Sequence, residues 1–186
     1  TPAATSAPGR TILWNGRDLT GWTLFVGDPT VDPNGVWSAR DGVLTFDTKA
    51  KGYLRTIKTF SNFHLHVEWC WPKDAVANCN SGVMVHSQAP ETILKEQDWP
   101  ISVEAQFLAG DRTTMNVCTP GTDIYMHGEM VKQHCVNSSS RKYGDDGWIS
   151  VQVEVLGGET VRHLIDEKVV LEYQKPSIGG GVANGY

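Results

Sequence analysis

Several features that mark particular classes of protein are missing from this sequence. No apolar run approaches the roughly 20 residues of a membrane-spanning helix, so membrane insertion is not expected. The 16 Lys and Arg form no run and are outnumbered by 21 Asp and Glu, which argues against binding to nucleic acids or anionic membranes. No GxSxG, P-loop or GxGxxG motif is present, so serine nucleophile chemistry and nucleotide binding have little support. A neutral or polar small ligand fits this mildly acidic chain better.

Cysteine is scarce, and none of the four cysteines lies in a CxxC pair, which disfavours a zinc knuckle. Cys70 closes an apolar segment and Cys79 lies in the loop after it, while Cys118 and Cys135 bracket another loop. We therefore favour two loop-closing disulfides, Cys70 with Cys79 and Cys118 with Cys135, in an oxidising compartment. Sequence alone allows three pairings, and four free thiols are the alternative.

What is present is the composition of a globular domain. Of 186 residues, 40% are hydrophobic, and the 19 Gly bring the apolar share to about half. This length supports one domain with a substantial core, or two small domains at most. Residues 1–10 are mostly small and include prolines, so we expect a flexible leader, similar to what remains after signal-peptide cleavage. Residues 11–186 are then expected to form a single domain.

Hydrophobic residues alternate with a period of two wherever a pattern exists, which indicates strands with one apolar and one polar face. The clearest strands are expected at 63–71, 149–155, 161–166 and 169–173, and shorter ones at 42–46, 53–56, 82–86 and 101–108. A short helix is expected over 91–98, between two prolines. Many short strands separated by turns predict an all-β fold, a two-sheet antiparallel sandwich or jelly roll with little helix.

Candidate functional residues lie on the polar faces of three of these strands. They are His64, His66 and Glu68 on the first, Asn80, Gly82, Met84 and His86 on the second, and Ser102, Glu104 and Gln106 on the third. Solvent-facing strands favour Thr, Lys and Glu, so this mixture of imidazole, amide and carboxylate groups suggests a site. Each residue could equally be a solvated or hydrogen-bonded surface group.

Several kinds of chemistry are open to these residues. Glu104 and Glu68 could form a carboxylate pair of the glycosidase kind, or either could pair with Arg55 or Arg112. Trp99 and Trp148 could stack on a sugar ring or fill the core. A metal site is a further alternative, although no HExxH or comparable spacing exists; its ligands would come from His66, His86, His127 and His134.

The order of segments resembles the 3-keto-disaccharide hydrolase domain family. The resemblance covers almost everything from Ile12 onward, and in this order the individually weak motifs are specific. It rests on LWNGRDLTGW (13–22), WSARDGVL (37–44), GYLRT (52–56), SNFHLHVEW (61–69), NSGVMVH (80–86) and VEAQFL (103–108). The later CTPGT (118–122), HCVNSSSRKYGDDGW (134–148) and VRHLIDEKVVLEYQKP (161–176) resemble one branch of the family especially closely.

The resemblance implies a concanavalin A-like jelly roll in a secreted or periplasmic bacterial protein that acts on sugars oxidised at C3. A ketone at C3 acidifies the proton on C2, so the glycosidic bond can be cleaved by base-assisted elimination, with water added afterwards. Such a site needs a base, a group that stabilises the developing oxyanion, and an acid near the leaving group. Family members usually continue beyond the equivalent of Tyr186, so the resemblance implies that the last strands are supplied by further chain or by another copy.

Roles for individual residues follow from the family's motifs. Glu104 would be the base, with Glu68 or His86 as the acid, although His86 stands where many members have Arg. The substrate would be held by Asn80, Gln106, Trp99, Lys132, His134 and His66. A divalent cation acting as a Lewis acid is a further option, without a legible ligand set. The alternative function is a non-catalytic carbohydrate-binding module, and an oligomer is compatible with either.

Overall fold

The computed structural model describes residues 9–47, 50–72, 79–94, 97, 99–144 and 147–179. The chain forms two compact units, Thr1–Phe60 and Ser61–Tyr186. Apart from Gly9 and Arg10, the expected leader lies outside the described residues, and a single domain over residues 11–186 stays a prediction. Within the described part, no helix is long and apolar enough to cross a membrane.

The first unit is built from two antiparallel strand pairs. β1 (Trp22–Val26) pairs with β4 (Gly52–Thr56), and the rings of Phe25 and Tyr53 stack with centroids 4.7 Å apart. β2 (Trp37–Arg40) and β3 (Val43–Phe46) form a hairpin around Asp41-Gly42, where both residues have positive φ. That conformation matches the right-handed twist of the flanking strands. A 3-10 turn, η1 (Pro33–Gly35), is capped by the Asp32 side chain.

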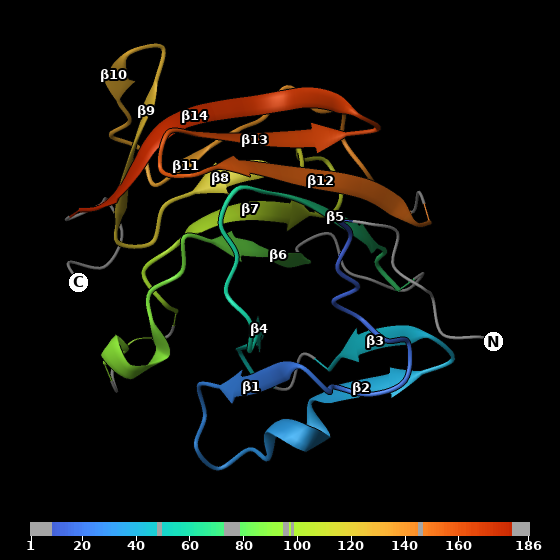
Figure 1. The fold of residues 1–186 in the computed structure, drawn as a ribbon. Helices are drawn as coiled ribbons and strands as arrows, with labels where there is room; N and C mark the ends of the chain where they lie inside the picture. The colour runs from blue at the N-terminus through green and yellow to red at the C-terminus, as the bar shows by residue number, and fades with distance from the viewer. Residues whose placement is uncertain are drawn as a thin grey trace. The chain divides into compact units, whose positions relative to one another are not determined.

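The second unit contains two antiparallel sheets (Figure 1). The six-stranded sheet has the order β10-β9-β14-β13-β12-β5, and the four-stranded sheet has the order β11-β8-β7-β6. The strands of the first are β10 (Glu129–Met130), β9 (Thr122–Met126), β14 (Lys168–Ile178), β13 (Thr160–Ile165), β12 (Ile149–Leu156) and β5 (Phe63–Trp69). Those of the second are β11 (Cys135–Val136), β8 (Asn116–Cys118), β7 (Val103–Leu108) and β6 (Asn80–Val85).

The core of this unit lies between the two sheets. Alternate residues of β12, such as Val151 and Val153, are almost completely buried, as is Ala105 of β7. The ring of Trp69 on β5 stacks on that of Phe107 on β7, with centroids 4.8 Å apart and planes within 4°. Each fully buried aliphatic or aromatic side chain contributes roughly 1.5–3 kcal/mol. Hydrophobic burial between facing sheets therefore holds the predicted all-β sandwich together.

Every strand expected from alternation overlaps an observed strand, but the expected helix over 91–98 is wrong. Among the described residues of this segment, Pro90–Thr92 form the 3-10 turn η2, and Ile93 is already extended at φ −73° and ψ 124°. Forming the first turn of a helix is entropically unfavourable, and a helix of eight residues is stable only if it buries an apolar face. Strands β1, β2 and β8 to β11 were not expected, since they are short or lack clear alternation.

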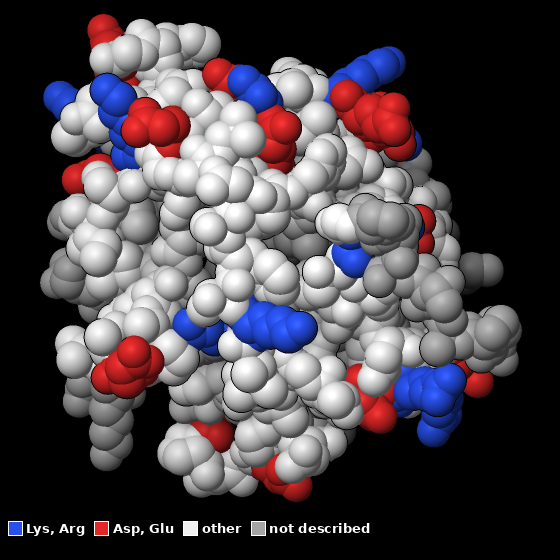
Figure 2. Space-filling model, in the orientation of Figure 1, with Lys and Arg blue, Asp and Glu red and all other residues white. Residues whose placement is uncertain are grey.

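Charged side chains of both signs are interspersed on the face of the molecule shown in Figure 2. On β13, Arg162 forms salt bridges with Glu154 of β12 at 2.7 Å and with Glu172 of β14 at 2.6 Å. These pairs cross neighbouring strands on the outer face of the six-stranded sheet, which is typical of solvated sheet surfaces.

Candidate functional site

The polar residues of β7 lie on the outer face of the four-stranded sheet. Val103, Ala105 and Phe107 point into the core, so the alternate residues, Glu104 and Gln106, point away from it. Strand register gives each of them a neighbour on either side. The outer face therefore carries two adjacent rows of opposed residues: Met84, Glu104 and Cys118 in one, and Gly82, Gln106 and Asn116 in the other.

The carboxylate of Glu104 lies over the backbone of Gly82. A Cβ atom placed on Gly82 would lie 2.5 Å from Glu104 Oε1 and 2.7 Å from the carbonyl oxygen of Ala105. Both distances are too short for any side chain, so glycine provides the space that the carboxylate occupies.

The environment of Glu104 raises the pKa of its carboxyl group. Burial raises the pKa of its carboxyl to about 7, and no charge or hydrogen bond from a described residue offsets this desolvation. Arg112, one expected alternative partner, donates instead to the carbonyl oxygens of Cys79 and Ala109. A carboxyl group that titrates near neutral pH is well suited to take and return a proton.

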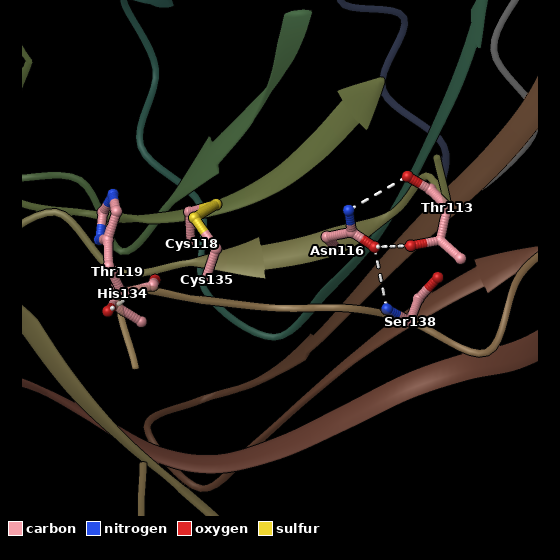
Figure 3. Close-up of a disulfide and its surroundings, with 7 residues drawn as sticks. All are labelled: Thr113, Asn116, Cys118, Thr119, His134, Cys135 and Ser138. Atoms are coloured by element: carbon pink, nitrogen blue, oxygen red, sulfur yellow. Dashed lines mark hydrogen bonds between the residues drawn. A yellow bond between two sulfur atoms is a disulfide. The ribbon is translucent and has the colours of Figure 1, made fainter. Parts of the chain in front are cut away.

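Asn116, in the row beside that of Glu104, connects β8 to neighbouring loops by hydrogen bonds. The sequence alone did not identify this residue. Its Oδ1 accepts hydrogen bonds from the Thr113 hydroxyl at 2.8 Å and from the Ser138 backbone N–H at 2.9 Å (Figure 3). Its Nδ2 donates to the Thr113 carbonyl oxygen at 3.1 Å. Asn116 therefore anchors the start of β8 to two loops.

The expected disulfide between Cys118 and Cys135 is present at the edge of this face (Figure 3). The two cysteines are directly opposed on β8 and β11, 17 residues apart in the sequence. The bond therefore ties strand β11 to the sheet that carries Glu104.

The second expected disulfide is wrong, because Cys70 and Cys79 are free thiols. Cys70 follows β5 of the six-stranded sheet, whereas Cys79 precedes β6 of the four-stranded sheet. Facing sheets pack about 10 Å apart, and a disulfide needs Cα atoms within about 7 Å. Proximity in sequence therefore does not bring these two cysteines into bonding distance.

Two more of the expected site residues lie near the Glu104 face. Asn80 is exposed at the start of β6 and in phase with Gly82. His134 precedes β11, and its ring lies beside the disulfide; its carbonyl oxygen accepts a hydrogen bond from the Thr119 N–H at 2.9 Å. Together with Glu104 and Gln106, these residues place acidic, amide and imidazole groups on one side of one sheet.

Three other expected site residues lie outside the strands, so strand alternation does not place their side chains on this face. His86 follows the end of β6 with φ +51°, so alternation no longer sets its direction, and desolvation lowers the pKa of its imidazole. Lys132 is exposed between β10 and β11. Trp99 is half-buried ahead of β7, and its carbonyl oxygen accepts a hydrogen bond from Gln97.

The expectation that Glu68 and His66 share a site with Glu104 is wrong. On β5, Leu65, Val67 and Trp69 face the core, so Glu68 and His66 lie on the outer face of the opposite sheet. The whole core separates them from Glu104, by more than the roughly 5–9.5 Å that glycosidase carboxylate pairs require. His66 Nε2 instead lies 3.0 Å from Ser150 Oγ, in a shallow depression that includes Gln152 and Asp166.

One group of metal-ligating side chains gathers within the described residues: Cys118, His134 and Cys135, whose ligand atoms all lie within 4.8 Å of one another. Metals bind cysteine as the thiolate, and both sulfur atoms are here committed to the disulfide. The divalent cation considered from the sequence stays a prediction.

Comparison with known families places the chain. A family model described as a 3-keto-alpha-glucoside-1,2-lyase-like domain matches residues 9–184. The chain belongs to this family. The match confirms the resemblance seen in the sequence and supports membership of a carbohydrate-active family. A comparison with curated proteins gave no match.

Proposed function

We propose that this 3-keto-alpha-glucoside-1,2-lyase-like domain cleaves the glycosidic bond of 3-keto-glycosides, such as 3-keto-disaccharides, by elimination, with Glu104 as the base. The observation that carries this proposal is the position of Glu104: a desolvated carboxyl on a polar sheet face, held over Gly82 without a neutralising partner among the described residues. Together with the family match over residues 9–184, this favours a base that acts near neutral pH.

The proposed reaction is an elimination followed by the addition of water. A carboxylate oxygen of Glu104 takes the C2 proton, and the electron pair is delocalised onto the C3 oxygen. The pair then forms the C1=C2 bond while the bond from C1 to the glycosidic oxygen breaks, and that oxygen takes up a proton. Addition of water across C1=C2 completes the hydrolysis. The amide N–H groups of Gln106 and Asn80 are suited to stabilise charge on the C3 oxygen.

The structure reduces the number of candidate residues for the acid of this reaction. Glu68 lies on the other sheet, which leaves His86 of the two expected candidates. Desolvation lowers the pKa of His86, so its protonated form gives up a proton more readily than an ordinary imidazolium.

Product analysis with a 3-keto-disaccharide tests the proposal. Glu104→Gln should lower kcat at least about 100-fold, the usual contribution of a general base, while sugar affinity measured by calorimetry is retained. Glu68→Gln is the matched control, because it removes a carboxylate from the opposite sheet, and it should leave kcat unchanged. Undiminished turnover by Glu104→Gln would contradict the assignment. Binding of oxidised and unoxidised sugars without any turnover would favour the carbohydrate-binding module instead.

We also propose an oxidising compartment, extracellular or periplasmic, for this protein. The disulfide between Cys118 and Cys135 supports it, since such bonds persist outside the reducing cytosol.

A further inference from the structure

We propose that reduction of the disulfide between Cys118 and Cys135 converts it, together with His134, into a binding site for a tetrahedral divalent cation such as zinc. This inference is independent of the proposed activity. The observation behind it is the clustering of one imidazole nitrogen and two sulfur atoms, all within 4.8 Å of one another, at the edge of the four-stranded sheet.

The ligand set has the right chemistry. Two thiolates and one imidazole form the Cys2His set of zinc sites that keep their fourth position open to water. With metal–ligand bonds of about 2.0–2.3 Å, ligand atoms around a tetrahedral ion lie roughly 3.5–4 Å apart. Atoms already within 4.8 Å need only small side-chain rotations to reach this geometry once the sulfur atoms are no longer bonded.

Backbone contacts hold these three residues together independently of the disulfide. Cys135 and Val136 of β11 are paired with Cys118 and Val117 of β8, and Val117 is fully buried in the core. The His134 carbonyl oxygen also accepts hydrogen bonds from the N–H and the hydroxyl of Thr119, at 2.9 and 3.2 Å. The ligands are therefore expected to stay clustered after reduction.

A second anchor lies just beyond β11. The Ser138 N–H donates to Asn116 Oδ1 at 2.9 Å, and the Ser138 hydroxyl donates to the Thr114 carbonyl oxygen at 2.5 Å. Strand β11 is thus tied to the sheet on both sides of Cys135, by Thr119 before it and by these bonds after it. Because these contacts already order the ligands, metal binding costs less conformational entropy.

The site is open to reductants and to ions. Cys118 is buried, but Cys135 and His134 are exposed, so a reductant can reach the Cys135 sulfur. A phosphine reductant cleaves the bond with one water, giving two thiols and the phosphine oxide. Binding of a divalent cation then displaces the two thiol protons, which makes its affinity rise with pH.

Cobalt titration of the whole chain tests the proposal. The chain is reduced with a phosphine, desalted without oxygen and titrated with Co²⁺, which reports thiolate ligation by charge-transfer absorption and tetrahedral geometry by visible d–d bands. Reduced protein should bind Co²⁺ in a 1:1 complex that Zn²⁺ displaces. The oxidised protein should show neither signal.

Matched variants locate the ligands. Replacing both Cys118 and Cys135 by Ser should abolish charge transfer, whereas replacing the free thiols Cys70 and Cys79 by Ser should leave it unchanged. His134→Ala should weaken binding more than about 10-fold, since even outer contacts to a metal are worth that much. His127→Ala, an exposed imidazole between β9 and β10, should have no effect.

Each opposite result would overturn the proposal. Absence of charge transfer in the reduced wild type, or its persistence without Cys118 and Cys135, would show that no such site forms. Equal affinity of His134→Ala and His127→Ala would remove the imidazole from the ligand set. Loss of the β-sheet circular dichroism on reduction would show that the backbone does not hold the ligands together.

Discussion

Glu104 and Gly82, opposed diagonally on β7 and β6, fit together so closely that the carboxylate occupies the space where any other residue would have its Cβ. That atom would lie 2.5 Å from Glu104 Oε1 and 2.7 Å from the carbonyl oxygen of Ala105. The side chain of Glu104 can move, but the Ala105 backbone is held in the sheet. Gly82 therefore positions the carboxyl that we propose as the base.

Gly82→Ala should accordingly damage both the fold and the site. The added methyl group must displace Glu104 and push against β7, so we expect a loss of about 1–3 kcal/mol in the free energy of unfolding, measured by urea denaturation. Gly158→Ala is the control, because a Cβ at Gly158 meets nothing within 4 Å and its backbone is unstrained. If both variants were equally stable, the close approach would be wrong.

Glu104 should make the protein less stable as the pH rises. Its pKa is raised from 4.5 to about 7, so between these values the unfolded chain is ionised while the folded chain keeps its proton. Ionisation then favours the unfolded chain, and the linkage amounts to roughly 3 kcal/mol above pH 7. Glu104→Gln should be more stable than the wild type at pH 8, with little gain at pH 4, by thermal denaturation. An equal difference at both pH values would contradict the raised pKa.

His163 should limit stability in acid. Its ring is buried, and desolvation lowers the pKa of the imidazole to about 4 from 6.5. The unfolded chain takes up the proton first, so stability is full above about pH 6.5 and falls by roughly 3 kcal/mol as the pH drops through 4. His163→Gln should flatten the pH dependence of the unfolding free energy in this interval. It should also carry a constant loss, because His163 Nδ1 lies 2.9 Å from the Met115 carbonyl oxygen.

The same pH series on His127→Gln gives the comparison for His163. His127 is exposed in the turn between β9 and β10, so this variant should follow the wild-type profile. A His163→Gln profile parallel to that of the wild type would show that the pKa of His163 does not differ between the folded and the unfolded chain.

Alkylation followed by mass spectrometry checks the cysteine assignment. Under denaturing conditions without reductant, Cys70 and Cys79 should be the two residues modified, and Cys118 and Cys135 should be modified only after reduction. Peptide mapping distinguishes the pairs. Modification of all four without reductant, or recovery of a peptide that links Cys70 to Cys79, would contradict the structure.

Local patterns in the sequence were sufficient for the strands with clear alternation and for their inward faces. Alternation in Phe63–Trp69 and in Val103–Leu108 identified which residues enter the core, because burial of every second side chain is a property of a single strand. The family motifs likewise identified the membership that the match over residues 9–184 confirmed. The disulfide between Cys118 and Cys135 also followed from their positions around one loop.

Tertiary structure alone decided which polar faces lie together. Alternation shows that Glu68 and Glu104 both point away from the core, but it does not show that β5 and β7 belong to different sheets. That depends on pairing with distant strands: β5 pairs with β12, which lies some 80 residues further along the chain, and β7 pairs with β6 and β8. The sequence therefore determined the strands with clear alternation, their buried faces and the family. Long-range strand pairing placed Glu104 beside Gly82 and the disulfide, and it put Glu68 on the far side of the core.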